Sequence, residues 1–390
     1  MRTDAGSSTR GGGRPSRARH VVLTLLVLHY LNTYMDRVAI SMGAPVIREE
    51  FGFGPGALVL IFGAFSLGYA MFQIPGGWLA DRFGPRRVLS GIVTYWSIFT
   101  VATAAAWSAG SLLVIRFLFG SGEAGAFPAA TRAISRWFPA SERAFAQGVT
   151  HAGARLGAVI TPPIAALMIV RWGWRSVFVL FGLLGIVWVA GWYLYYRDRP
   201  EEHGSVDAGE LAVIREGRPQ QEGGSSGSPV PWRAVLRSAN VRALCAMYFL
   251  YVCVVWIFFT WFPTYLVETR HFSLVEAGFW SSLPLVAAVV GNSLGGWASD
   301  RLIGRVGLRR ARRRVAVVGF GIAVVFLPLG AVAPTAVSAV ACFAVAVGSL
   351  ELTTGVSWAV PVDIGGDWAG TISALMNTCG NVGGMLSAMA

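Results

Sequence analysis

Charged residues are scarce in this chain. They make up 13% of its 390 residues, whereas 54% are hydrophobic and the mean hydropathy is +0.57. A soluble domain carries roughly 25% charged residues, so this chain cannot cover its surface with polar groups in water. The composition excludes a soluble enzyme, a nucleic-acid-binding module, a disordered protein and a secreted disulfide scaffold. It predicts an all-α membrane protein whose solvent is the lipid bilayer.

Lysine is absent, so all 32 basic residues are arginine, and they give a formal charge of +12 against 20 acidic residues. Cysteine is also rare. The four cysteines lie in apolar runs without C-x-x-C spacing, so neither a disulfide framework nor a zinc site is indicated. No metal-ligand cluster, nucleophile motif or phosphate-binding loop stands out, so we expect no cofactor, no bound metal and no enzymatic activity.

Long apolar runs are abundant, and a membrane-spanning helix needs about 20 such residues. We predict eleven spans, six before a polar segment and five after it. They fall in residues 21–43, 57–80, 88–131 (two spans, divided at 108–111), 144–170, 174–196, 243–267, 277–299, 315–362 (two spans, divided at 333–334) and 368–390.

These spans divide the chain into four parts. A basic cytoplasmic tail (1–20) precedes a first six-helix half (21–197), and a cytoplasmic linker (198–242) precedes a second half (243–390) with five helices. The linker is rich in Arg, Glu, Gly, Ser and Pro, includes GGSSGSP at 223–229, and is predicted to be flexible.

Arginine placement predicts the orientation in the membrane. With a cytoplasmic N-terminus, 25 arginines lie on the inner side, 4 on the outer side and 3 within spans. We therefore expect the N-terminus inside. Because the arginines fall between apolar runs, they indicate topology rather than binding of nucleic acid.

One motif occurs twice. GGWLADR (76–82) closes the second predicted span and GGWASDR (295–301) closes the eighth, 219 residues later. Both have the pattern G-G-W-x-x-D-R and both precede further arginines. This spacing predicts duplication of a six-helix unit in one orientation, a parallel repeat found in transporters. By the same offset, residue 390 corresponds to residue 171, so the second half is one helix short of the first.

These motifs resemble the major facilitator superfamily. GGWLADRFGPRR (76–87) is similar to its signature loop between helices two and three. The longer segments more narrowly resemble the anion:cation symporter family. They are LNTYMDRVAIS (31–41), GYAMFQIPGGW (68–78), RFLFGSGEAGAFPAATRAISRWFPASERAFAQG (116–148), GARLG (153–157), TWFPTYL (260–266) and NTCGNVGG (377–384).

The resemblance implies a major facilitator fold and proton-coupled uptake of a small organic anion. It also implies a monomer in the bacterial cytoplasmic membrane. A hexuronate, an aldonate or aldarate, an aromatic acid and a small dicarboxylate all remain open as substrates. The alternatives are an exporter of drugs or metabolites with the same fold, or a member that does not transport.

Six charges lie within the predicted spans: Asp36, Arg37, Arg116, Glu123, Arg155 and Glu351. Each costs about 2.5–3.5 kcal/mol at the centre of a membrane, so they must pair or face water. The first half holds three arginines against one Asp and one Glu. We interpret this excess as a site that an anionic substrate completes.

The substrate candidates follow from helical spacing. Arg37, whose planar fork suits a carboxylate, shares a helix face with Tyr34. Arg116 shares a face with Glu123, seven residues on. Arg155 lies near mid-membrane, at a position that looks occupied by Gln in some members of the family that the chain resembles. Further candidates for contacts with substrate hydroxyls, or for lining the cavity, are Tyr69, Gln73, Trp261, Tyr265, Asn377 and Asn381; packing and interhelical hydrogen bonding are the alternatives for them.

Two carboxylates are candidates for proton coupling. The resemblance implies that Glu123 carries the proton, and a buried carboxylate holds a proton more readily than an exposed one. Its alternative is a structural ion pair with Arg155 or Arg37. Asp36 is the second candidate, with a salt bridge to a neighbouring helix as its alternative. Glu351 is left as an inner-gate residue or without a role.

The duplicated motif supplies the predicted gate residues, Asp81 with Arg82 and Asp300 with Arg301. We expect Asp81 to pair with an arginine and with the positive N-terminus of a nearby helix, and Asp300 to do the same in the second half. Such contacts would hold the inner side closed. His29 and His151 are expected to be packing residues.

Overall fold

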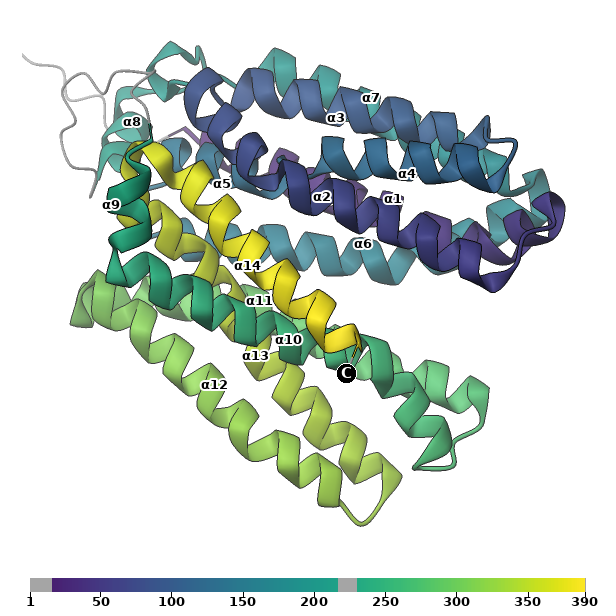
Figure 1. Ribbon diagram of the computed structural model, residues 1–390. Helices are drawn as coiled ribbons and strands as arrows, with labels where there is room; N and C mark the ends of the chain where they lie inside the picture. The colour runs from purple at the N-terminus through teal and green to yellow at the C-terminus, as the bar shows by residue number, and fades with distance from the viewer. Residues whose placement is uncertain (1–15, 217–229, 390) are drawn as a thin grey trace, which may run out of the picture.

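The computed structural model describes residues 16–216 and 230–389, and these residues form a bundle of long helices (Figure 1). Before the polar segment lie α1 (Ala18–Phe51), α2 (Pro55–Phe83), α3 (Pro85–Ala104), α4 (Ala109–Glu123), α5 (Ala126–Trp137), α6 (Arg143–Trp172) and α7 (Trp174–Tyr195). After it lie α10 (Ala239–Glu268), α11 (Leu274–Val306), α12 (Leu308–Val332), α13 (Ala336–Gly365) and α14 (Ala369–Met389).

The two predicted divisions at 108–111 and 333–334 are confirmed, and each coincides with a capping residue. Ser108 accepts a hydrogen bond from the Ser111 amide at the start of α4. Thr335 does the same for the Ser338 amide at the start of α13. Such side chains satisfy amide groups that have no partner within the helix, so each new helix begins where the sequence predicts it.

One break was not predicted. The fourth span is divided into α4 and α5 at Ala124 and Gly125. Pro128 has no amide hydrogen to donate to the carbonyl of Ala124, which weakens the helix there. The break makes Glu123 the last residue of α4, so its carboxylate lies at the interruption between α4 and α5.

The helix packing repeats between the two parts of the chain. In the first, α1 packs on α6 and α2 on α4; in the second, α10 packs on α14 and α11 on α13 in the same relative order. The most extensive contacts between the halves are those of α6 with α11 and of α2 with α14. In Figure 1 the two groups lie close together at the end that carries α8 and α9 and diverge toward the other end.

The double glycine of the duplicated motif lies in these contacts. A Cβ on Gly77 of α2 would lie 2.5 Å from the Gly370 carbonyl oxygen of α14, and one on Gly296 of α11 would lie 2.2 Å from the Ala144 carbonyl oxygen of α6. Only glycine lets the backbones approach so closely. The second glycine of each motif therefore faces the opposite half.

Eight helical stretches of the described residues are long and apolar enough to cross a membrane; α4 with α5, and α13 with α14, each count as one. Helix α1, which contains Asp36 and Arg37, and α3, which begins Pro85-Arg86-Arg87, are outside these eight. The fold is that of an all-helical, multi-pass membrane protein, and the count of eleven spans stays a prediction.

The predicted flexible linker is wrong for much of its described length. It contains a 3₁₀ turn (Pro200–Glu202), α8 (Ala208–Arg215) and α9 (Trp232–Arg237). Glu210 of α8 is fully buried, and its carboxylate accepts hydrogen bonds from Ser16 and from the amides of Ala18 and Arg19. The segment therefore caps the N-terminus of α1, where a negative charge is favourable. The GGSSGSP stretch at 223–229 lies outside the described residues.

Removal of this cap should destabilise the first helix. We expect Glu210→Ala to lower the free energy of unfolding by about 1–3 kcal/mol, because it removes a cap and leaves buried amide groups without partners. Thermal unfolding in detergent measures this, with Glu202→Ala on the exposed 3₁₀ turn as the control. An equal melting temperature for wild type and Glu210→Ala would contradict the role of Glu210 as a cap of α1.

Candidate functional site

Arg37 and Glu123 form an ion pair between α1 and the end of α4. The Arg37 Nε lies 2.6 Å from the Glu123 Oε1, and the arginine side chain is 22% exposed while the glutamate is 0% exposed. The guanidinium lies over the rings of Tyr34 and Tyr69, 5.3 and 4.7 Å from their centroids. An incoming ion therefore meets the arginine before it meets the carboxylate behind it.

Arg155 and Glu351 form a second pair, which joins α6 of the first half to α13 of the second. The Arg155 NH2 lies 2.7 Å from the Glu351 Oε1, with 15% of the arginine side chain exposed and none of the glutamate. The other oxygen of Glu351 accepts hydrogen bonds from Asn292 (2.9 Å) and Thr354 (3.0 Å). This pair is fixed at the interface between the halves.

Asp36 and Arg116 are buried more deeply. Asp36 is 1% exposed and accepts a hydrogen bond from Asn32 at 3.3 Å. Arg116 is 2% exposed, stacks 4.3 Å above the Phe119 ring, and acts electrostatically on Asp36 and Glu123. Arg116 is therefore enclosed in this conformation by α4 and by Phe65 of α2, and its role as a substrate ligand stays a prediction.

The charge balance also differs from the sequence interpretation. The first half alone has an excess of one arginine, but Glu351 of the second half supplies the missing negative charge. The six charges predicted within the spans are thus three of each sign, and two of the three arginines already bind protein carboxylates. An anion that binds the Arg37 Nε or the Arg155 NH2 must therefore replace a protein carboxylate.

Four predicted polar residues meet along α2 and α14. Asn377 donates a hydrogen bond to the Tyr69 hydroxyl (3.3 Å), and Asn381 donates to the Gln73 Oε1 (3.3 Å). The Gln73 Oε1 also accepts from Thr378 at 3.0 Å. These are interhelical bonds between the halves, which is the alternative interpretation of the asparagines. Because Tyr69 also contacts Arg37, the seam continues directly into the first ion pair.

Trp261 and Tyr265 lie elsewhere. Tyr265 packs on Phe343 and accepts a hydrogen bond from Arg270 at 2.6 Å, and Trp261 is 48% exposed. Their one-turn spacing is a weak signal, because a helix rich in apolar and aromatic residues is apolar on several faces. His29, by contrast, is buried between the rings of Trp96 and Trp188, which confirms its packing role; His151 lies in the same aromatic cluster.

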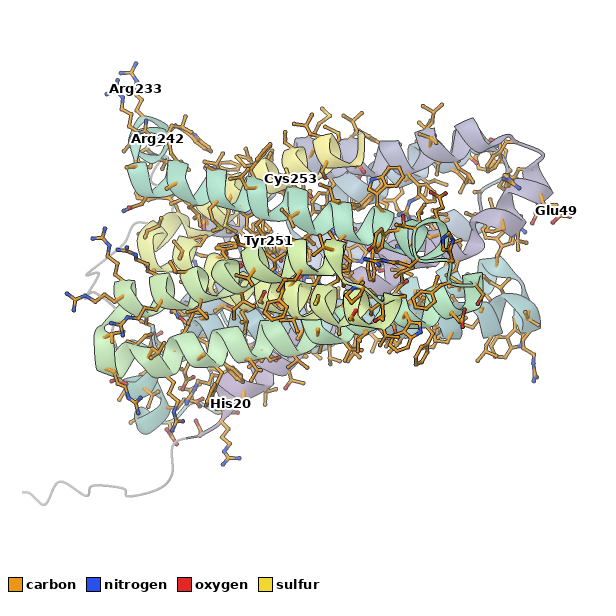
Figure 2. All side chains as sticks on the ribbon, turned by 90° about the horizontal axis from the view of Figure 1, so that it is seen from below. His20, Glu49, Arg233, Arg242, Tyr251 and Cys253 are labelled. Carbon is orange, nitrogen blue, oxygen red and sulfur yellow. The ribbon has the colours of Figure 1, made fainter. Side chains whose placement is uncertain are left out.

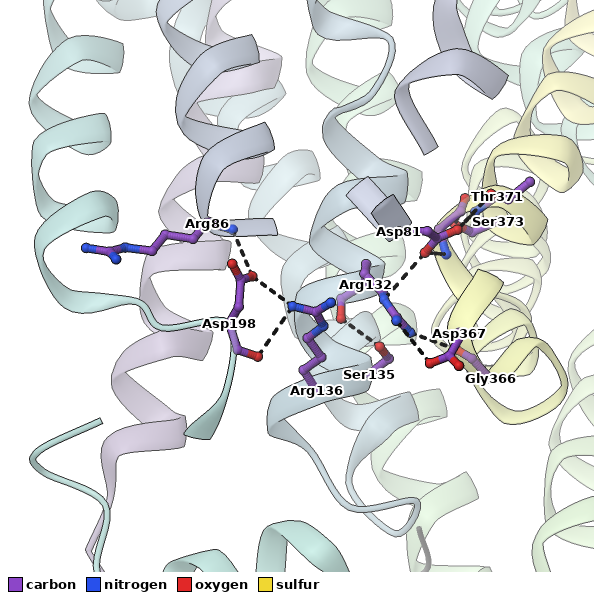
Figure 3. A network of polar contacts seen from close by, with 11 residues as sticks. Asp81, Arg86, Arg132, Ser135, Arg136, Asp198, Gly366, Asp367, Thr371 and Ser373 are labelled. Atoms are coloured by element: carbon purple, nitrogen blue, oxygen red, sulfur yellow. Dashed lines mark hydrogen bonds and ion pairs between the residues drawn. The ribbon is translucent and has the colours of Figure 1, made fainter. Parts of the chain in front are cut away.

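Asp81 lies at the N-terminus of α14, across the interface from its own half (Figure 3). Its carboxylate accepts hydrogen bonds from the amides of Gly370 (2.9 Å) and Thr371 (2.7 Å) and from the Thr371 hydroxyl (2.7 Å). Arg132 lies between Asp81 and Asp367, 3.4 Å from each. Both expected partners, an arginine and a helix N-terminus, are present.

Asp300 makes the equivalent contacts in the second half. It accepts hydrogen bonds from the amides of Ala144 (3.3 Å) and Phe145 (2.7 Å) at the start of α6, and it pairs with Arg312. The Arg312 Nε also binds Asp363 at 3.0 Å. The two motif aspartates therefore cap helices of the opposite half in a symmetric arrangement.

The arginines of the motif itself do not join these contacts. Arg82 is exposed and lies over the rings of Trp78 and Phe83, and Arg301 is exposed over Trp297. Their prediction as gate partners is wrong, because each follows its aspartate by one residue and so points about 100° away around the helix. The arginines that pair with the two aspartates are instead Arg132 and Arg312, which in the sequence analysis serve only to predict the orientation in the membrane.

These contacts lie at the end of the bundle that carries the polar segment. Figure 2 places His20, Arg233 and Arg242 at that end, Glu49 at the opposite end and Tyr251 between them. Tyr251 exchanges a hydrogen bond with Thr354 (2.8 Å), which itself binds Glu351. The Arg155–Glu351 pair is therefore connected to a residue midway along the bundle, away from the two aspartate caps.

A helical bundle with buried ion pairs between two repeated halves defines a multi-pass membrane transport protein, and known proteins give its family. The model of the Major Facilitator Superfamily matches residues 24–388, and the chain belongs to that superfamily, among its anion transporters. These relatives are transporters and not enzymes. No group of residues able to hold a metal ion occurs in the described parts of the chain.

Three relatives illustrate the similarity. The probable sulfoacetate transporter SauU of Cupriavidus necator is 42% identical over 374 residues, which are 95% of this chain and 86% of that protein. The hexuronate transporter of Bacillus subtilis is 32% identical (94% and 86%). The probable galactarate/D-glucarate transporter GudP of Escherichia coli is 32% identical (96% and 86%).

Solved structures share the fold. The proton:xylose symporter XylE superposes with a TM-score of 0.73 at 14% identity, covering 95% of this chain and 87% of the other. The Escherichia coli fucose:proton symporter FucP superposes with a TM-score of 0.68 at 15% identity (96% and 91%). At these identities the likeness concerns the architecture alone.

Proposed function

We propose that this protein takes up a small organic anion together with a proton, with Arg37 as the anion ligand and Glu123 as the proton carrier. The observation that carries the proposal is the Arg37–Glu123 pair, in which the arginine side chain is 22% exposed and the glutamate side chain is not exposed at all. The relatives described as transporters of sulfoacetate, hexuronate and galactarate or D-glucarate support an acidic substrate.

The pairing itself supplies a reason for coupling. An anion that binds Arg37 displaces Glu123, and a fully buried carboxylate without its partner is costly by several kcal/mol. Uptake of a proton by Glu123 removes that cost. The anion and the proton therefore stabilise each other's binding, which is the thermodynamic requirement of a symporter. Asp36 is 1% exposed behind this pair and is the second candidate on the proton path.

The two aspartate caps suit the alternation of access. Asp81 and Asp300 each hold the N-terminus of a helix in the opposite half, and the arginine distribution supports a cytoplasmic position for that end. We infer that these caps close the inner side while the outer side is open, and that they break when the halves rock about the central site.

The test is transport into proteoliposomes that contain the purified protein. Sulfoacetate, D-glucuronate and D-glucarate are offered outside, with and without an inward proton gradient. We expect at least one of them to accumulate only with the gradient, and its entry to acidify the lumen. Transport of none of these acids, or accumulation that ignores the gradient, would refute the proposal.

Asp81→Asn should slow transport with little loss of affinity. The substitution weakens charge-assisted bonds worth about 1.5 kcal/mol or more, so the inner-closed state is less populated and turnover falls about tenfold. Initial rates over a range of substrate concentrations separate the maximal rate from the half-saturating concentration. Asp367→Asn, whose carboxylate is half exposed beside the same arginine, is the control. A pure change in affinity would contradict the gate role.

A further inference from the structure

A second ion pair joins the two halves, and the mechanism above does not use it. Arg155 and Glu351 are 196 residues apart in sequence, yet their side chains meet at 2.7 Å. Asn292 and Thr354 orient the carboxylate from α11 and α13, and the Tyr251 hydroxyl of α10 binds Thr354. Five side chains from four helices thus build this position.

Its arrangement matches that of the first pair. In both, a partly exposed arginine stands in front of a carboxylate with no exposed surface. If the second pair served stability alone, apolar side chains of similar volume would do as well or better, because desolvation offsets the attraction of buried ions. The repeated arrangement instead provides a second guanidinium that an outside ion can reach.

One tyrosine connects the two arginines. The Arg37 guanidinium lies 5.3 Å from the centroid of the Tyr34 ring and the Arg155 guanidinium 5.9 Å from it. The Arg155 NH1 also donates to the Tyr34 hydroxyl at 3.4 Å. The two guanidiniums are therefore no farther apart than the sum of the two centroid distances, which a short molecule with an acidic group at each end can span.

We propose that the transported anion is doubly charged, with one acidic group on Arg37 and the other on Arg155, and that Glu351 takes up a second proton when it releases Arg155. This inference rests on the proposed function. Around Glu351, the described groups include the cation Arg155 on α6, the amide of Asn292 on α11, the hydroxyls of Thr354 and, through it, Tyr251, and the phenol of Tyr248 on α10. Once Arg155 has moved to the substrate, none of these neighbours compensates a negative charge.

The test compares acids that differ in one charged group. Sulfoacetate and isethionate share a sulfonate, but the carboxylate of the first is a hydroxymethyl group in the second. D-glucarate has a second carboxylate where D-glucuronate has an aldehyde. Affinities are measured by thermal shift of the purified full-length protein and by competition for uptake into proteoliposomes.

The decisive variant is the double substitution Arg155→Gln with Glu351→Gln, which removes both charges and leaves amides able to bond to each other. We expect wild type to bind the dianion of at least one pair about tenfold or more tightly than its monoanion. In the double variant the affinity for the dianion should fall about tenfold or more, with the monoanion affinity within about twofold of wild type.

A matched control exists on the same two helices. Arg143 of α6 binds Asp363 of α13 at 3.1 Å, so Arg143→Gln with Asp363→Asn also neutralises an ion pair between the halves. It should leave the ratio of the two affinities unchanged even if turnover falls.

The outcomes separate the two proposals. A double variant that keeps the preference for dianions, or a wild-type protein that prefers monoanions, overturns the dianion inference while anion transport through Arg37 stands. If wild-type protein binds none of the four acids, both proposals fail.

Discussion

Glu123→Gln should abolish the share of the anion's accumulation that the proton on Glu123 drives, while sparing exchange of anion for anion. Glutamine has the shape of the protonated glutamate, so Arg37 is released to the substrate, but the variant has no proton to give up. One coupled proton supports about a tenfold accumulation per pH unit, equivalent to about 1.4 kcal/mol. With a gradient of two units the loss should reach about 100-fold.

Two assays on the same proteoliposomes measure this result. Accumulation is followed with an imposed proton gradient, and exchange is followed by counterflow from a preloaded lumen with no gradient. Glu50→Gln is the matched control, because that carboxylate also pairs with an arginine, Arg175, but is 39% exposed and lies in the last turn of α1. Wild-type accumulation by Glu123→Gln would remove Glu123 from the proton path.

Arg37→Ala should abolish binding of the anion. The Arg37 side chain is more exposed than that of Arg155, and its guanidinium offers a planar fork that an alanine cannot replace. Truncation of one partner in a buried charge pair costs about 2–5 kcal/mol, so the affinity should fall at least about 30-fold. Arg37→Lys, which keeps the charge and loses the fork, should fall between the wild type and the alanine variant.

Thermal-shift titration with the transported acid gives these affinities without depending on turnover. Arg175→Ala is the control for loss of an arginine, since its ion pair with Glu50 is largely exposed and outside the site. Near-normal affinity in Arg37→Ala would refute the ligand role. Loss of affinity together with loss of the folded state would be recognised from the melting temperature of the substrate-free protein.

Local signals in the sequence predicted much of the architecture correctly. Breaks in the apolar runs predicted the divisions at 108–111 and 333–334, and the structure adds the caps Ser108 and Thr335, whose hydroxyls satisfy free amides. The duplicated motif predicted that Asp81 and Asp300 would meet an arginine and a helix end. These features depend on short spacing along the chain, which sequence periodicity records directly.

Contacts between distant segments were harder to predict. Glu351 had no assigned role, because nothing local indicates that α13 brings it against Arg155, 196 residues earlier. The same reason hid the partners of the aspartates, Arg132 and Arg312, within a general excess of inner-side arginines. The interpretation that a substrate completes the charge balance rests on the charges of the first half alone. The negative charge that completes it belongs to Glu351, a residue of the second half.

The linker was misjudged for a different reason. Its composition is typical of a flexible segment, but one acidic side chain, Glu210, finds the free amides at the start of α1 and becomes fully buried. Composition averages over many residues and does not register a single anchoring contact of this kind.

The close backbone approach at Gly77 and Gly296 offers a way to trap the molecule. A methyl group at either position acts as a wedge, since it would meet the facing carbonyl oxygen well inside van der Waals distance. Gly77→Ala and Gly296→Ala should therefore disfavour the arrangement described here and enrich the opposite one, in which these faces have separated. Such locked forms would make the second conformation accessible to direct structure determination.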